Sequence, residues 1–366
     1  MTTPFAQRRR ALRKQLDEAE LGALIVTQPA SWYYLTGFTG EAGALILSAA
    51  GTTLITDSRF TEQARREAPG VRVVQQVRAL PTAVGEFLKD APKGRGRTSR
   101  KIGFPAAHLT VAQFRAIRRA AGPRVHWAPA EGFVERLRGR KDPQELAVMR
   151  RAAALADKVM AHAFTVLKPG VRELEVAAEI EYQMRQLGAS GPAFETIVAF
   201  GERSAYPHAR PTDKRLRKNE LVVLDMGAIL AHYCSDITRT VVVGKASPKV
   251  RGWHKAVQEA RTAAVAAVRA GVTCGEVDAA ARQVLAGHRL DRYFTHSTGH
   301  GLGIEVHEDP RVAKGQKQKL EPGNVITIEP GVYVPGVGGI RIEDDVAVHS
   351  GESEVLTRTP RDIIEI

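Results

Sequence analysis

The sequence predicts an α+β protein of two domains, with the functional residues in the second domain. Three observations support this prediction. Short apolar, β-branched segments alternate with amphipathic segments in the first part of the chain, as in mixed α/β domains. A helix–helix–hairpin unit occurs twice in the second part, and each hairpin carries two carboxylates, which indicates an internal duplication. The length of 366 residues is sufficient for two domains.

The first domain is expected to span residues 1–135 and to alternate strands with helices. An amphipathic helix is expected at residues 5–20, followed by glycine-containing loops that include SWYYLTGFTG (Ser31–Gly40). The basic stretch Lys93–Lys101 is expected to be an exposed loop. The other strands are expected at 23–27, 44–48, 52–60, 71–77, 101–105 and 125–129, and the other helices at 60–68, 84–91 and 111–120.

The second domain is expected to span residues 142–366 and to begin with a long helix, because Asp142 followed by Pro143 is a favourable helix start. A weak repeat follows. KPGVRELEVAAEIE starts at Lys168 and RAGVTCGEVDAAAR starts at Arg269. Short matches of this kind arise by chance in alanine-rich helices. Here each copy precedes a strand pair with two carboxylates, so the sequence favours a duplicated unit whose two hairpins meet at one site.

The first of these hairpins is the segment Leu221–Val243, LVVLDMGAILAHYCSDITRTVVV. If the chain reverses near Leu230 and Ala231, Asp225 and Asp236 lie opposite each other on neighbouring strands. Cross-strand partners are about 4.5–5.5 Å apart at Cβ. Two carboxylates that close, between apolar flanks, repel each other unless a cation or protons lie between them.

The second hairpin is NVITIEPGVYVPGVGGIRIEDDVAV, with Glu329 and Glu343. A reversal near Gly336 sets these two glutamates across from each other. Arg341 is two positions before Glu343 and therefore on the same face of the sheet.

A glycine-rich segment, HSTGHGLGIEVHEDP, lies between the hairpins and carries three histidines, as expected of backbone bent around a ligand. With the two hairpins it offers one imidazole and four carboxylates as candidate ligands: Asp225, Asp236, His300, Glu329 and Glu343. This oxygen-rich set favours Mn²⁺, Co²⁺, Fe²⁺ or Zn²⁺ and has enough oxygens for two ions. Paired ions about 3.5–4 Å apart can activate a water and polarise a carbonyl, so the predicted reaction is hydrolysis.

The motifs around these residues resemble those of proline peptidases in the methionyl aminopeptidase-like superfamily, which contains Xaa-Pro aminopeptidase and Xaa-Pro dipeptidase (prolidase). The resemblance runs from about Asp142 to the C-terminus and includes HSTGHGLGIEVHE (His296–Glu308), DMG with SDITRT, TIEPG and GGIRIEDD. The first domain is similar to the creatinase-like N-terminal domain of these enzymes, with YLTGF (Tyr34–Phe38) and LITDSRF. The resemblance implies a pita-bread catalytic fold.

The resemblance also implies a role for each candidate ligand. It assigns Asp225 to one metal ion and His300 to the other, and it makes Asp236 and Glu343 bridge the two. Glu329 is expected to bind the ion held by His300. Glu329 is also expected to act as the general base on the attacking water.

Five further residues are expected on the substrate side. His208, in SAYPHARP, matches a histidine near the scissile bond. His307 and Arg341 match groups that orient the substrate and stabilise charge at the carbonyl. His296 is expected to line the proline side of the pocket. Tyr206 departs from the family, which more often has an aliphatic residue there, so it is either a substrate contact or a packing residue.

The function expected from the resemblance is hydrolysis of the bond between an N-terminal residue and a following proline, with dipeptides also possible substrates. The alternative is a strict Xaa-Pro dipeptidase. Mn²⁺ is the expected metal, with Co²⁺ or Zn²⁺ as alternatives, and the expected assembly is a homodimer or a larger even oligomer. A methionyl aminopeptidase would keep the five ligands but not the long N-terminal domain. A creatinase-like or non-catalytic binding role usually comes with lost ligands, and none is lost here.

The net charge of +13 raises the alternative of a basic, non-catalytic binding protein for nucleic acid or anionic membranes. The basic residues are spread along the chain with acids between them, and no nucleic-acid-binding motif is present. An arginine-rich surface is therefore the favoured interpretation, with neither nucleic acid nor membrane as a partner. No signal peptide or membrane-span pattern is found, and the two cysteines form no disulfide framework, so a cytoplasmic location is expected.

Overall fold

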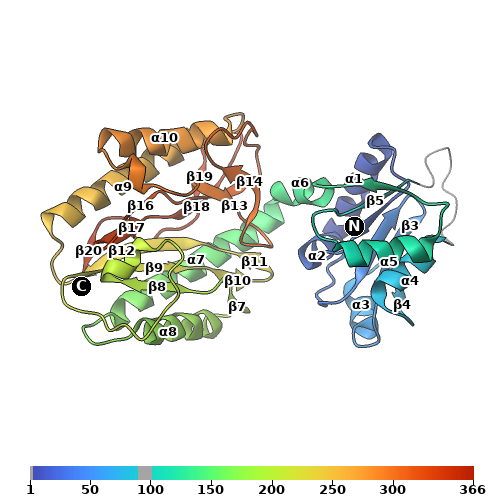
Figure 1. Ribbon diagram of the computed structural model, residues 1–366, viewed down its shortest axis with the longest axis horizontal. Coiled ribbons are helices and arrows are strands. Elements are labelled where there is room, and N and C mark those ends of the chain that lie inside the picture. The colour runs from blue at the N-terminus through green and yellow to red at the C-terminus, as the bar shows by residue number, and fades with distance from the viewer. Residues whose placement is uncertain (1–2, 90–100) are drawn as a thin grey trace. The chain divides into compact units, whose positions relative to one another are not determined.

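The structure is a computed structural model that describes residues 3–89 and 101–366. The chain divides into two compact units, residues 1–138 (unit 1) and residues 139–366 (unit 2). Both units mix helices and strands, so the predicted α+β class is confirmed (Figure 1). Apart from Lys101, the predicted loop Lys93–Lys101 lies outside the described residues. Among the described helices, none has both the length and the apolar character that a membrane span requires.

Unit 1 is built on one six-stranded sheet in the order β4-β3-β2-β1-β5-β6. The strands are β1 (Ala23–Val26), β2 (Ala44–Ser48), β3 (Gly51–Thr56), β4 (Arg72–Gln75), β5 (Lys101–Phe104) and β6 (His126–Pro129). β1, β5 and β6 are parallel, whereas β2 runs antiparallel to both β1 and β3. The helices are α1 (Pro4–Glu18), α2 (Pro29–Thr36), α3 (Thr61–Glu67), α4 (Leu80–Lys89), α5 (Val111–Ala121) and α6 (Phe133–Gly139).

Helix α2 corrects one expectation, because most of it lies in the stretch Ser31–Gly40 that the sequence predicts as a loop. Pro29 occupies the first turn, where its missing N–H costs no helical hydrogen bond. Gly37, at φ 82°, ends the helix in the left-handed conformation. Trp32 and Leu35 are both buried. The helix has only eight residues and buries most of them, so it shows no amphipathic period from which it could be predicted.

Unit 2 contains two helix pairs and the strands that lie between them. Its helices are α7 (Pro143–Val166), α8 (Glu173–Gln186), α9 (Pro248–Ala267) and α10 (Cys274–Gly287), with short 3₁₀ turns η1 (Gly201–Ala205) and η2 (Asp291–Tyr293). The strands of the first half are β7 (Gly191–Pro192), β8 (Ile197–Phe200), β9 (Glu220–Met226), β10 (Ala228–Leu230), β11 (Tyr233–Cys234) and β12 (Ile237–Val243). Those of the second half are β13 (Gly299–Gly301), β14 (Glu308–Val312), β15 (Val325–Ile328), β16 (Gly331–Val334), β17 (Gly338–Arg341), β18 (Asp344–Ala347), β19 (Glu354–Val355) and β20 (Ile364–Glu365).

The two helix pairs cover opposite sides of the strands in unit 2 (Figure 1). One apolar core joins α7 and α8 to β8, β9 and β12, and a second joins α9 and α10 to β15–β18. Each Å² of apolar surface removed from water stabilises a fold by about 25 cal/mol. These two cores therefore stabilise the strands that lie between the helix pairs.

The internal duplication appears in the backbone hydrogen bonds. Gly170 N–H donates to Leu216 O in the first half, and Gly271 N–H donates to Leu320 O in the second, both at 2.8 Å. Isolated antiparallel bridges also recur at equivalent places, with Arg172 in the first half and Thr273 in the second. Each half therefore ties the start of its second helix to the segment that precedes its next strand.

Candidate active site

Asp225 and Asp236 lie on the first hairpin of unit 2, but they are not directly opposite each other. The pairing of β9 with β12 sets Asp225 against Thr238. The chain turns at Ala231 and His232, whose φ values of 46° and 69° are left-handed, one residue later than expected. A turn shifted by one residue moves the pairing by two positions, so the two carboxylates stay on one face as diagonal neighbours. The predicted direct opposition is wrong, and the shared face is retained.

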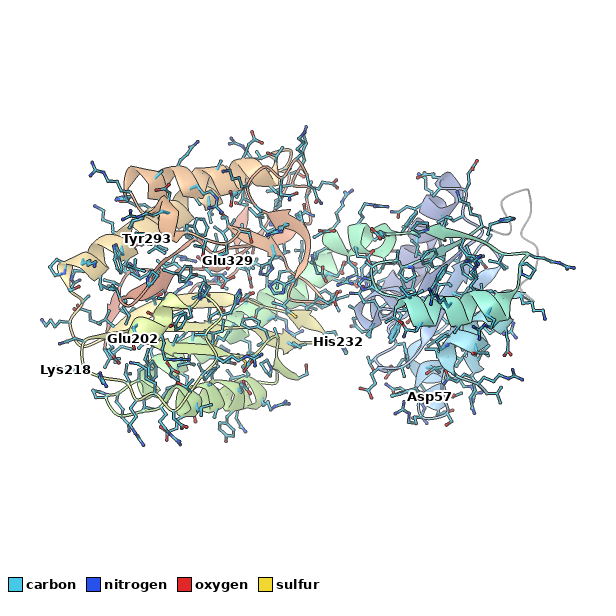
Figure 2. The ribbon with its side chains drawn as sticks, viewed as in Figure 1. Asp57, Glu202, Lys218, His232, Tyr293 and Glu329 are labelled. Atoms are coloured by element: carbon cyan, nitrogen blue, oxygen red, sulfur yellow. The ribbon has the colours of Figure 1, made fainter. Side chains whose placement is uncertain are left out.

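Glu329 and Glu343 lie on the second hairpin, and they face each other as predicted. β15 pairs with β18, and β16 pairs with β17, in one continuous register. The two glutamates fall in the gap between these two ladders, where they are across from each other. Figure 2 labels Glu329, which lies among the strands between the two helix pairs.

His300 enters the site from β13. Its Nδ1 is 3.0 Å from the Gly301 carbonyl, which fixes the proton on Nδ1 and leaves Nε2 as an acceptor. Nε2 lies 3.7 Å from Asp236 Oδ2 and 3.6 Å from Glu329 Oε1. Gly299 has to be a glycine, because a Cβ there would lie 1.9 Å from the Thr327 carbonyl of β15. The close approach of β13 to β15 therefore places the His300 imidazole beside Asp236 and Glu329.

Asp236, His300 and Glu343 form a group that fits a divalent cation. One ligand atom from each lies within 4.8 Å of the others. The Oδ1 atoms of Asp236 and Asp225 are buried and accept no hydrogen bond from the described residues. A buried, unsatisfied carboxylate oxygen is costly, and oxygen with imidazole ligands is the chemistry that such cations take. Asp225 and Glu329 adjoin this group but do not belong to it geometrically.

Burial and mutual repulsion change the pKa values of these candidate ligands. Burial, with the nearby charges of Glu343 and Asp225, raises the pKa of Asp236 well above its ordinary value. Burial also raises the pKa of Glu343 well above its ordinary value, helped by Glu329. For Glu329, burial raises the pKa to about 7 despite the opposing charge of Arg341. Burial lowers the pKa of His300 to about 4, which keeps its imidazole neutral and able to bind a metal.

A chain of hydrogen bonds runs from the first hairpin to His296. Arg341 pairs with the Asp225 carboxylate through Nη2 and donates from Nη1 to the Tyr333 hydroxyl at 2.7 Å. The Tyr333 hydroxyl lies 2.8 Å from His296 Nε2. His296 Nδ1 faces the Ser297 carbonyl at 2.8 Å, so Nε2 is the acceptor. Burial lowers the pKa of His296 to about 4 and keeps the ring neutral.

Thr238 joins the two hairpins directly. Its hydroxyl donates to Glu343 Oε2 at 2.5 Å and accepts from Arg341 Nε at 3.1 Å. Because Thr238 is also the residue opposite Asp225, this one side chain links the candidate ligands of the first hairpin to those of the second.

The remaining predicted residues lie at the edge of this cluster. His307 packs edge-on against His300, with ring centroids 4.3 Å apart. Burial lowers the pKa of His307, and the charge of His208 lowers it further. His208 is exposed, and Tyr206, in the same loop, has 61% of its surface exposed. The carbonyl of Pro207 between them accepts from Arg341 Nη1 at 3.2 Å, which ties the loop to the site.

Sequence reasoning missed several residues that shape the site. Thr238 could have been found from the sequence, because it lies two positions after Asp236 and therefore on the same face of the strand. The sequence indicates Tyr333 more weakly, as a ring with a hydroxyl on the strand that pairs with the strand of Arg341. Nothing in the sequence indicates Asp278 on α10. It is buried and accepts from the backbone N–H and the hydroxyl of Thr298 at 3.2 and 2.8 Å, a contact between distant segments.

Comparisons with known proteins identify the family of each domain. Residues 147–350 match the model of metallopeptidase family M24, and residues 8–139 match the creatinase/prolidase N-terminal domain. The Xaa-Pro dipeptidase of Pyrococcus horikoshii is 36% identical over 353 residues, which cover 95% of this chain and 96% of that relative.

Solved structures agree over nearly the whole chain. The Xaa-Pro dipeptidase from Bacillus anthracis has a TM-score of 0.93 and 38% identity, covering 99% of this chain and 100% of that one. The X-Pro aminopeptidase from Thermotoga maritima has a TM-score of 0.89 and 33% identity, covering 98% and 99%. The predicted resemblance is therefore confirmed, and the chain belongs to metallopeptidase family M24, with a creatinase/prolidase N-terminal domain.

Proposed function

We propose that this protein is a metal-dependent exopeptidase that hydrolyses the bond between an N-terminal residue and a following proline. The observation that supports this most strongly is the group of Asp236, His300 and Glu343, in which both carboxylates are buried, in a chain of family M24. In this proposal residues 142–366 form the catalytic domain and residues 1–135 the creatinase-like domain.

Two divalent ions would be held by Asp225, Asp236, His300, Glu329 and Glu343, with Asp236 and Glu343 shared between them. When bound, such ions supply an activated water and a Lewis acid for the scissile carbonyl. Mn²⁺ is the proposed metal, with Co²⁺ or Zn²⁺ as alternatives, because this ligand set accepts several ions.

Glu329 is the proposed general base. Its carboxylate oxygen Oε1 lies 3.6 Å from His300 Nε2, where it would take a proton from the attacking water and pass it to the leaving proline nitrogen. The position of Glu329 is set by its backbone N–H, which donates to the Thr298 carbonyl at 2.8 Å.

The substrate is proposed to bind between the histidines and Arg341. Arg341 and His307 would orient the peptide and stabilise the charge that develops on the carbonyl oxygen. His208 would lie near the scissile bond. His296, held by Tyr333, would line the proline side of the pocket. An Xaa–Pro bond has no N–H, so a site that grips the carbonyl and the ring suits this substrate.

Relatives named Xaa-Pro dipeptidase and X-Pro aminopeptidase both match this chain. We therefore propose cleavage before proline in longer peptides as well as in dipeptides, with a strict dipeptidase as the second candidate. The exposed Tyr206 is the proposed contact for substrate that extends beyond the proline ring. A homodimer or larger even assembly and a cytoplasmic location remain predictions from the sequence.

A substrate panel tests the proposal. Protein treated with a chelator and resupplied with Mn²⁺, Co²⁺ or Zn²⁺ is incubated with Ala-Pro, Ala-Pro-Ala and Met-Ala-Ala. Cleavage of both proline peptides is the expected result, and cleavage of Ala-Pro alone would make the enzyme a strict dipeptidase. Turnover of Met-Ala-Ala alone would overturn the proline specificity and leave the metal site intact.

A further inference from the structure

We propose that Glu173 is a positioning residue that holds the loop carrying His208 in place. This inference rests on the proposed function, in which His208 lies near the scissile bond. Glu173 begins α8, and its side chain is completely buried. A buried carboxylate is costly unless its oxygens accept hydrogen bonds, so its partners indicate its purpose.

Among the described residues, the hydrogen-bond partners of the Glu173 carboxylate all lie on the loop formed by residues 200–212. At one end, Oε1 accepts from the backbone N–H of Phe200 at 2.9 Å. At the other end, Oε2 accepts from the backbone N–H of Thr212 at 2.9 Å and from its hydroxyl at 2.6 Å. Arg203 Nε, inside the loop, lies 3.0 and 3.1 Å from the two oxygens. One carboxylate therefore closes a loop whose two ends meet, as in compact Ω-type loops.

The far side of this loop reaches the candidate active site. Pro207 O accepts from Arg341 Nη1, and the Ser204 hydroxyl accepts from the Gly339 N–H of β17 at 2.8 Å. Ala209 is buried in a small apolar cluster with β8 and β9. His208 is exposed between these anchors. Its position is therefore determined at the base by Glu173 and at the tip by β17.

Glutamine cannot replace this glutamate, because every partner is a donor. The four donor groups are two backbone N–H groups, a guanidinium and a hydroxyl. An ionised carboxylate only accepts, whereas an amide would direct its NH₂ at one end of the loop. The amide N–H would then face a backbone N–H, either that of Phe200 or that of Thr212, and this backbone donor would lose its acceptor.

The second half of unit 2 contains a similar arrangement. Asp278, on α10, accepts from both the backbone N–H and the hydroxyl of Thr298. Arg282, paired with Asp278 at 2.7 Å, donates to the His296 carbonyl at 2.6 Å. Each half thus uses a buried carboxylate on its second helix, with an arginine partner, to hold a segment that carries a histidine of the site.

The test compares Glu173→Gln with a matched control on the same helix, Glu175→Ala. Glu175 caps α8 at Arg172 and makes no hydrogen bond to the loop in the described structure. For each variant, kcat and KM for Ala-Pro with Mn²⁺, bound Mn²⁺ per chain and amide hydrogen exchange of residues 200–212 are measured. His208→Ala and the double variant Glu173→Gln/His208→Ala complete a mutant cycle. Thr212→Val weakens one end of the loop without changing the charge and serves if Glu173→Gln fails to fold.

The expected result for Glu173→Gln is wild-type Mn²⁺ content, faster exchange in residues 200–212, and a fall in kcat/KM of about ten- to a hundredfold, the loss typical of a misplaced group. The double variant should be within about twofold of His208→Ala, because both changes act through one residue. Losses that multiply, or unchanged exchange, would overturn the inference. A fully active His208→Ala or an enzyme inactive on Ala-Pro would instead refute the proposed function, and the exchange data would still decide whether Glu173 holds the loop.

Discussion

Replacing Asp278 with alanine should destabilise the protein more than removing an exposed carboxylate from the same helix. The Thr298 N–H, on a fully buried residue, would lose its acceptor, which costs about 1–3 kcal/mol. Arg282 would lose a pair that is partly open to solvent, which costs about 1 kcal/mol or less. The free energy of unfolding should therefore fall by about 1–4 kcal/mol.

The assay is urea unfolding at pH 7 with saturating Mn²⁺, followed by circular dichroism. The matched control is Glu276→Ala, which removes the capping-box carboxylate of α10 and should cost about 1 kcal/mol. Asp278→Ala should also lower kcat/KM, because Thr298 O holds the Glu329 N–H. Equal losses of stability in the two variants would refute the reasoning that the Asp278 hydrogen bonds hold the histidine segment.

Three further predictions concern the metal ligands, the substrate side and an ion pair. Asp236→Ala should abolish Xaa-Pro turnover by removing a shared ligand, and unchanged metal-dependent activity would defeat that assignment. His307→Ala should reduce kcat with metal still bound, so loss of the metal would show that His307 is a ligand. Arg150 lowers the pKa of Glu354 from its ordinary 4.5 to about 2, so the pair stabilises the fold above pH 4.5 and this contribution is lost as pH falls towards 2. Arg150→Ala should therefore be destabilising in thermal unfolding at pH 7 and should approach the wild type only as pH falls towards 2, and a difference independent of pH would contradict this.

The two hairpins show how far spacing alone can place a site. Glycines mark the turn after Tyr333, so Glu329 and Glu343 were paired correctly. The other turn lies at Ala231 and His232, which carry no such signal, and its centre was placed one residue early. Asp225 and Asp236 still lie on the same face of the sheet, because a shift of two positions preserves the alternation of side chains.

Polar contacts between distant segments were beyond sequence reasoning. Glu173 and Asp278 are ordinary helical acids in the sequence, and only the packing of α8 and α10 shows that they are buried against the loops of the site. Helix α2 was missed for a related reason, because its burial on most sides leaves no amphipathic period. The candidate ligands stand out in the sequence because they lie in short motifs, whereas the residues that support them do not.

The most direct test of the central claim is to measure bound divalent metal and Ala-Pro cleavage together. Chelator-treated protein is titrated with Mn²⁺, and bound metal per chain is measured by elemental mass spectrometry alongside kcat. The account predicts two ions per chain and turnover that rises as they bind. Full turnover in the metal-free protein, or two bound ions with no cleavage of any Xaa-Pro peptide, would contradict it.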